Sequence, residues 1–342
     1  MTMRVLAIAI AAALVAPAHA DVWKHATEGK DVQDVYDAAL AEGDAFATRA
    51  NAKSLNATQV GKLVDQAIDQ YTEASKARPK DGEPYYRIAM VLESYFTDCS
   101  TYTIRGVNMP PTCIGNGRVD LKRAEQTVLA WEEFEKRASL DPRLADSLFS
   151  RAILRTKLVQ TAKDPKRLLE GALVDYRALL DRADGLTMSS PEQVWGNLAE
   201  TYMMLGKMEE AIEAYQIALR LGGDSSTAYG LAVALDRDGS PAEALEVIRS
   251  QSEQAFVQYR QRHSRGEIFY VPSGEEYYYL ALVYEAWDRI PNAIEFWRQF
   301  IRSGAHPQFQ GRAKQHLDAL QAKVKAQPPK KLQRQPYEPY DW

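Results

Sequence analysis

Apolar residues recur every three or four positions along most of this chain. From Asp31 to Lys325 the spacing is nearly continuous, and the alternation of apolar and polar residues that marks half-buried strands is scarce. A period near 3.6 residues places apolar side chains along one face of a helix. The pattern therefore predicts an all-α protein made of many amphipathic helices.

A second pattern recurs within these helices, in which an alanine is followed four positions later by an aromatic or large aliphatic residue. Residues four apart lie on the same helix face. The alanine allows a partner helix to approach closely, and the larger side chain fills the space beside it. Each occurrence therefore predicts the second helix of a helix hairpin. The six pairs are Ala67/Tyr71, Ala130/Phe134, Ala172/Tyr176, Ala211/Tyr215, Ala244/Ile248 and Ala293/Trp297.

First helices are expected before these pairs. The helix near Leu148 to Val159 fits less well, because Arg151 and Arg155 stand where apolar residues are expected. We interpret that hairpin as degenerate. Three first helices share one spacing of apolar residues, and they begin near Tyr85, Ala228 and Tyr277.

The clearest window of the pattern reads Trp195-Gly196-Asn197-Leu198-Ala199-Glu200-Thr201-Tyr202, then Gly206, Ala211, Tyr215 and Ala218. This window resembles the tetratricopeptide repeat (TPR), a family with the pattern W-x2-L-G-x2-Y, then A-x3-F, then P, over about 34 residues. Here Ala199 stands where the family has Gly, and Tyr215 where it has Phe. The resemblance implies a right-handed superhelical TPR solenoid of about six helix pairs, in which neighbouring pairs bury each other's apolar faces.

A solenoid needs a polar end, and the helix expected from Pro307 to Val324 is the predicted C-terminal capping helix. Its proposed inner face carries Phe309, Ala313, Leu317, Leu320 and Val324.

The first twenty residues differ from the rest and are typical of a secretory signal peptide. Arg4 precedes an apolar run from Val5 to Val15, Pro17 interrupts it, and Ala18-His19-Ala20 is a small-x-small cleavage site. The run is too short to span a membrane, which takes about 20 residues. We therefore expect a periplasmic or secreted protein.

The expected division of the chain is a signal peptide at 1–20, a TPR solenoid at 21–326 and a flexible Pro-rich tail at 327–342. An insertion at 98–118 carries Cys99 and Cys113. In an oxidising compartment we expect these cysteines to form a disulfide. Two free thiols or a metal site are the alternatives, although no histidine flanks either cysteine and no C-x-x-C is present.

Composition narrows the classes of function. The formal net charge of −4 argues against a nucleic-acid binder, which needs a basic face. The sequence contains no P-loop, G-x-G-x-x-G after a strand, G-x-S-x-G or H-E-x-x-H motif. We therefore expect no enzyme activity, cofactor or metal.

The TPR resemblance implies that the first helices line a concave face that binds a partner protein or peptide. Tyrosines on such a face can act as anchors, because they bury a large area at low entropic cost. The alternative is that they pack between helices. The candidate partner-binding residues are Tyr86, Arg87, Asn197, Glu200, Tyr229, Tyr278 and Glu285, with Gly196 and Tyr279 nearby.

These expectations favour a non-catalytic protein–protein interaction scaffold or adaptor in the bacterial cell envelope. One alternative is a periplasmic, chaperone-like carrier of extended client polypeptides. Another is an accessory subunit of an enzyme that acts on the envelope. The sequence does not identify the partner.

Overall fold

The computed structural model describes residues 18–52, 55–97, 120–159, 162–182, 189–264, 268 and 272–326. These residues form fourteen α-helices and two short helical turns, with no strand among them. The all-α prediction is thus confirmed. Residues 1–17 of the predicted signal peptide, the whole insertion at 98–118 with both cysteines, and the tail from 327 lie outside the described residues.

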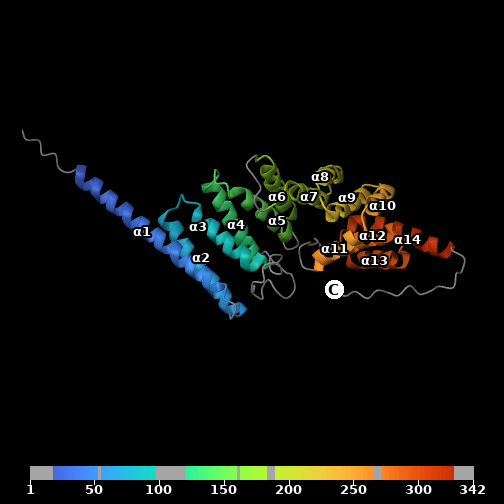
Figure 1. Ribbon diagram of the computed structural model, residues 1–342, viewed down its shortest axis with the longest axis horizontal. Helices are drawn as coiled ribbons and strands as arrows, with labels where there is room; N and C mark the ends of the chain where they lie inside the picture. Colours follow the sequence, from blue (N-terminus) through green and yellow to red (C-terminus); the bar gives the residue numbers. More distant parts are fainter. Residues whose placement is uncertain are drawn as a thin grey trace, which may run out of the picture.

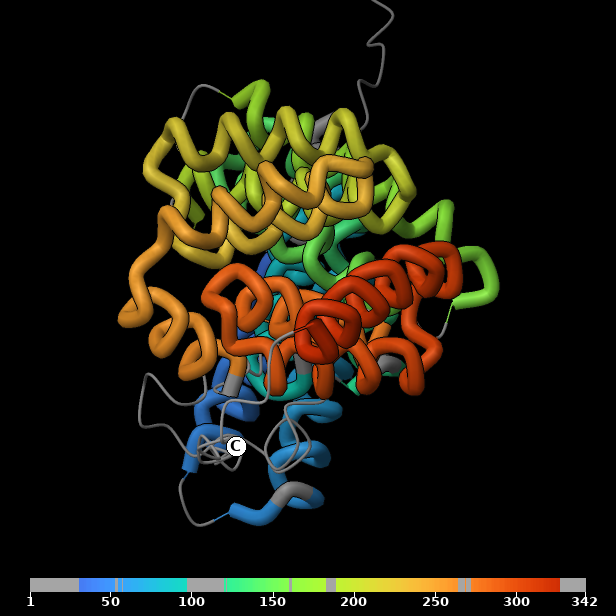
Figure 2. Tube along the Cα trace, turned by 90° about the vertical axis from the view of Figure 1, so that its right-hand side faces the viewer, coloured from blue at the N-terminus to red at the C-terminus, as the bar shows by residue number. Residues whose placement is uncertain are grey.

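The helices follow one another as hairpins in an elongated row (Figure 1), and Figure 2 shows α12 to α14 gathered beside the α9–α10 hairpin. Six hairpins are present in the described part of the chain, as the six alanine pairs predict. They are α1 (Ala18–Ala50) with α2 (Ala57–Ala77), α3 (Glu83–Leu92) with α4 (Leu121–Arg137), α5 (Leu144–Leu158) with α6 (Pro165–Leu180), α7 (Pro191–Met204) with α8 (Met208–Arg220), α9 (Ser225–Arg237) with α10 (Pro241–Arg249), and α12 (Glu276–Ala286) with α13 (Ile290–Ser303). A π-helical turn, Glu93–Thr97, extends α3.

Local sequence sets where these helices begin. Asn56 and Gln59 form a capping box at the start of α2, since each side chain accepts a hydrogen bond from the other residue's backbone N–H at 3.0 Å. Proline occupies the first helical position of α6, α7 and α10, where its missing N–H costs nothing.

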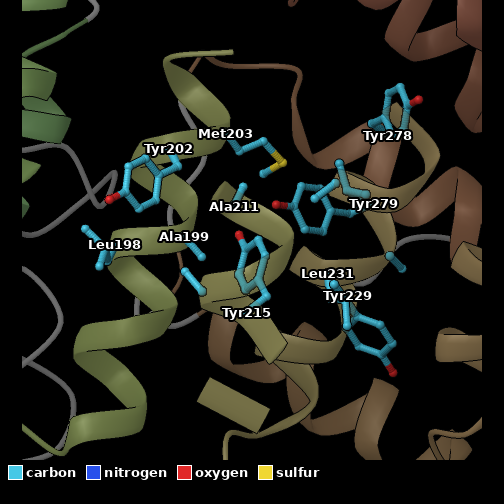
Figure 3. Packing of buried hydrophobic residues seen from close by; sticks show 14 of the residues in the cluster. Leu198, Ala199, Tyr202, Met203, Ala211, Tyr215, Tyr229, Leu231, Tyr278 and Tyr279 are labelled. Atoms are coloured by element: carbon cyan, nitrogen blue, oxygen red, sulfur yellow. The ribbon is translucent and has the colours of Figure 1, made fainter. Parts of the chain in front are cut away.

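Close helix approach explains the repeated alanines. The alanine of each pair is at most 6% exposed, and five of the six are fully buried. Figure 3 shows Ala199 of α7 and Ala211 of α8 between the two helices of one hairpin. Gly230 on α9 serves the same purpose, because a Cβ there would lie 2.5 Å from the ring of Tyr215.

The hairpin interpreted as degenerate is intact, and charged residues hold it together. Arg151 is 4% exposed and donates two hydrogen bonds to the buried Asp175 of α6, at 2.6 and 3.0 Å. Arg155 donates to the same carboxylate and, at 2.8 Å, to Glu132 of α4. A buried ion-pair cluster therefore stands where apolar contacts were expected.

An extra helix, α11 (Glu253–Ser264), lies between the fifth and sixth hairpins. Its Phe256 and Tyr259 pack edge-on against Tyr229 of α9, with ring centroids 6.3 and 4.9 Å away. The alanine pattern predicts no helix at this point.

The capping helix is α14 (Gln310–Ala326), preceded by a 3-10 turn at Pro307–Phe309, and it packs on α13. Its inner face carries Ala313, His316 and Leu320. Val324, which was expected on that face, is 47% exposed. That expectation is wrong because this turn of the helix lies beside the segment before α13, where Lys323 pairs with Asp288 at 2.8 Å. His316 takes a buried place that only apolar residues were expected to fill.

Two main cores run through the described helices. The smaller one joins α1, α2 and the end of α3, and includes Tyr71 and Leu92. The larger one extends from Ala89 of α3 to Leu320 of α14. Helix α3 therefore contributes to both. No described helix is both long and apolar enough to cross a bilayer.

Candidate functional site

A groove of about 480 Å³ runs along the first helices of the central hairpins. Helices α5, α7, α9 and α12 contribute to its wall, and α11 closes one side. Its apolar wall includes Phe149, Ile153 and Met204, and its polar wall includes Gln193, Asn197, Glu200, Ser226 and Thr227.

Helix α7 supplies most of the polar wall. Gln193, Asn197 and Glu200 lie three or four residues apart, so they share one helix face. Gln193 also fixes the start of the helix, because its side chain accepts a hydrogen bond from the backbone N–H of Ser190 at 3.2 Å. Gly196 lies on this face of α7 and has no side chain to fill the groove. A Cβ at this position would lie 3.7 Å from Thr227 of α9.

Glu200 stands between two tyrosines at the centre of the groove. The hydroxyl of Tyr215 on α8 donates to Glu200 Oε2 at 2.6 Å, and that of Tyr279 on α12 donates to the same oxygen at 3.2 Å. Figure 3 shows the two hydroxyls pointing toward each other. Burial raises the pKa of both tyrosines well above its ordinary value, and the Glu200 charge adds to the rise. Both phenols are therefore neutral donors at pH 7.

Helix α11 is joined to the rim of the groove by a polar contact. Arg262 forms an ion pair with Asp224 and donates to the hydroxyl of Ser226 at 3.1 Å. Asp224 also caps α9 by accepting from the backbone N–H groups of Ser226 and Thr227. The extra helix is thereby fixed to the start of α9.

The structure brings together only part of the predicted site. Asn197 and Glu200 line the groove, together with Gly196 and Tyr279. Tyr86 lies on α3, against Trp131 and with the guanidinium of Arg143 4.2 Å from its ring centroid.

Arg87, also on α3, forms ion pairs with Glu83 at 2.8 Å and with Asp44 of α1. It therefore ties the first two hairpins together and lies outside the groove.

Three candidates are engaged in helix packing. Tyr229 and Tyr278 are 1% and 0% exposed, so the expectation that they present exposed anchors is wrong. Helix α11 covers Tyr229, and the hydroxyl of Tyr278 donates to the buried Asp236 at 2.5 Å. Glu285 accepts a hydrogen bond from Trp297 Nε1 at 2.9 Å and contacts His316 Nδ1 at 2.9 Å.

Sequence reasoning missed the contribution of α11 to the groove through Tyr259 and Arg262. The sequence offers only a weak indication of this helix. Phe256 and Tyr259 are three residues apart, in a segment otherwise rich in polar residues. Among the described residues, no group of three or more His, Cys, Asp or Glu is placed to hold a metal ion.

Comparison with known families supports the reading of the central hairpin. The family model described as "Tetratricopeptide repeat" matches residues 192–223, which span α7 and α8. This segment is therefore similar to a tetratricopeptide repeat. It supplies Asn197, Glu200 and Tyr215 to the groove. No curated protein matches the sequence.

Several solved structures are similar to this chain at low identity and with TM-scores below 0.5. The structure described as "Functional Characterization of Pseudomonas Aeruginosa pilF" is 14% identical, with a TM-score of 0.42, and the match covers 86% of this chain and 99% of that one. The MamA protein is 15% identical, with a TM-score of 0.39 and coverage of 70% and 100%. YrrB, described as "a TPR protein with an unusual peptide-binding site", is 14% identical, with a TM-score of 0.37 and coverage of 72% and 99%.

Proposed function

We propose that this protein is a non-catalytic scaffold or adaptor that binds a segment of a partner protein in the groove along α5, α7, α9 and α12. The observation that carries the proposal is the groove itself. It combines apolar side chains such as Phe149 and Met204 with amide and hydroxyl groups from Asn197 and Thr227. Apolar area supplies binding energy, and a few placed polar groups set orientation. An extended polypeptide offers both kinds of complementary group.

We further propose that the protein acts outside the cytoplasm of a bacterium, in the cell envelope. The proposal rests on the composition of residues 1–20, with Arg4, the apolar run and the Ala18-His19-Ala20 sequence. Cell fractionation and N-terminal sequencing of the native protein test it. An N-terminus at Asp21 in the periplasmic or secreted fraction supports export, and an intact Met1 in the cytoplasm contradicts it.

Site-specific photo-crosslinking tests the scaffold proposal. The photo-reactive residue p-benzoylphenylalanine replaces Asn197 in the groove or, as a control, the exposed Glu213 on α8, which lies outside the groove. In cells that make the protein natively, we expect position 197 to capture one partner at fixed stoichiometry, and position 213 to capture none. Equal capture from both positions, or none from position 197, contradicts the proposal. Capture of many unrelated chains favours the carrier of client polypeptides instead.

A further inference from the structure

The carboxylate of Glu200 is the most unusual feature of the groove. It is part-buried, and it accepts the hydrogen bonds of Tyr215 and Tyr279 on the same oxygen, Oε2. Among the residues that the structure describes, Glu200 forms no ion pair, and Oε1 accepts no hydrogen bond. A carboxylate can accept about four hydrogen bonds. Glu200 therefore keeps one carboxylate oxygen, Oε1, open to a further hydrogen-bond donor.

The charged residues that line the groove are mostly acidic, as Glu200 is. Glu192, Glu200 and Asp224 are the acidic lining residues, and Arg262 is the basic one. Arg262 is bound to Asp224 at the rim. Glu192 and Glu200 therefore remain without a cation among the described lining residues, and the groove favours a cationic occupant. A charge that is partly removed from water is screened less than one at the surface, so its attraction for a cation is stronger.

The walls around Glu200 contain aromatic rings. Tyr176, Tyr215, Tyr259 and Tyr279 line the groove but are at most 4% exposed, so they offer edges and hydroxyl groups more than open faces. Phe149, Ile153 and Met204 are half-buried, and their apolar area fits the methylene stem of a lysine or arginine. The face of the Phe149 ring also attracts an ammonium or guanidinium group that lies within about 6 Å of its centre.

The tyrosines add no competing cation and no competing charge. Burial raises the pKa of Tyr259 as it does that of Tyr215 and Tyr279, and the nearby Glu200 charge contributes to each rise. The phenols therefore stay neutral, and they carry no charge that competes with Glu200 for a cation.

We propose that this groove binds a lysine or arginine side chain of the partner segment, with the charged end on Glu200 and the stem against the apolar wall of Phe149, Ile153 and Met204. The inference rests on the proposed scaffold function and specifies the chemistry of the partner: a basic segment. A preference for a basic side chain sets this groove apart from sites that capture a C-terminal carboxylate, because Glu200 would repel such a carboxylate.

The test uses fluorescein-labelled mixtures of ten-residue peptides. Each mixture has one fixed central residue, namely arginine, its neutral isostere citrulline, lysine, glutamate or leucine, and the other positions are random but exclude Lys, Arg and His. Fluorescence anisotropy with the full chain gives the dissociation constant of each mixture. We expect the arginine and lysine mixtures to bind at least tenfold more tightly than the citrulline mixture.

A matched pair of charge-neutralising variants assigns the preference to Glu200. In Glu200→Gln, the preference for arginine over citrulline falls to within twofold, whereas Glu213→Gln retains it. Circular dichroism and urea unfolding check that both variants fold. The arginine–citrulline comparison on the unaltered protein needs no variant, so a folding defect cannot hide a negative result.

The outcomes separate the two proposals. Binding of all mixtures with equal affinity, tighter binding of the glutamate mixture, or a full preference for arginine in Glu200→Gln overturns the basic-segment proposal and leaves the scaffold proposal standing. No binding of any mixture at millimolar concentration overturns both.

Discussion

The capping helix α14 is held by a buried histidine, and replacing this residue gives the sharpest prediction from the structure. His316 Nε2 lies 2.8 Å from Oδ1 of the fully buried Asp236 on α9, and Nδ1 lies 2.9 Å from Glu285 on α12. Its ring stacks on Trp297, with centroids 4.6 Å apart. Arg312 also binds Asp236, at 2.9 Å. The protonated imidazole therefore links α14 to two earlier helices.

The contribution of His316 protonation to stability can be calculated from its pKa. Burial alone lowers this pKa, but the hydrogen bonds and charges of Asp236 and Glu285 outweigh burial and raise it from 6.5 to about 9. Each unit of difference between folded and unfolded states corresponds to about 1.4 kcal/mol. Because the folded pKa is the higher one, protonation stabilises the fold by about 3 kcal/mol below pH 6.5, and this contribution is lost as the pH rises through 9.

The assay is amide hydrogen exchange of α14 in the wild type and in His316→Gln, corrected for the intrinsic exchange rate at each pH. Glutamine keeps hydrogen-bonding capacity but carries no charge. We expect the variant to open more easily at pH 6, and the difference in opening free energy to shrink by about 3 kcal/mol between pH 6 and pH 10. Subtracting the two proteins removes the titration of other groups, such as Glu275, whose pKa burial raises to about 7. A difference that stays constant with pH refutes the reasoning.

Two further predictions concern packing and charge within the hairpins. Gly230→Ala places a Cβ 2.5 Å from a buried tyrosine ring of α8 and should lower the free energy of unfolding by about 1–3 kcal/mol. Gly61→Ala on α2 meets nothing within 4 Å and should raise it by about 1 kcal/mol, so urea unfolding curves that shift in the same direction for both variants contradict the packing argument. Asp175→Asn leaves the buried Arg151 without its main charge partner and should destabilise by about 3 kcal/mol, whereas the exposed Glu170→Gln on the same helix should change stability by less than about 0.5 kcal/mol. Equal melting temperatures for these two variants would show that the buried pair contributes nothing.

The fold could be predicted because recurring alanines mark the positions where two helices pack closely together. Ala67 and Ala293 are completely buried, as the alanine pattern requires, although they lie at opposite ends of the chain. The pattern is less informative where polar groups replace apolar ones. Arg151 weakens the apolar period of α5, yet it is buried because Asp175 approaches it from the next helix, and no single-helix pattern contains that partner.

The site could be predicted only in part, for a similar reason. Asn197 and Glu200 follow from the register of one repeat, since the face of α7 is fixed by its own sequence. Tyr229 and Tyr278 occupy comparable positions on later helices, but other elements cover them. Helix α11 packs on Tyr229, and the charged cluster around Asp236 takes the hydroxyl of Tyr278. Which faces stay open depends on elements that do not belong to the repeat pattern.

The presence of two main cores has a consequence for how the molecule responds to heat. Helix α3 contributes to both cores, with Leu92 in the smaller one and Ala89 in the larger. In calorimetry such an arrangement gives two overlapping endotherms, because the N-terminal pair can melt while the remainder stays ordered. A peptide held between α5 and α12 would shift only the second endotherm upward, so the melting profile itself would report where a partner binds.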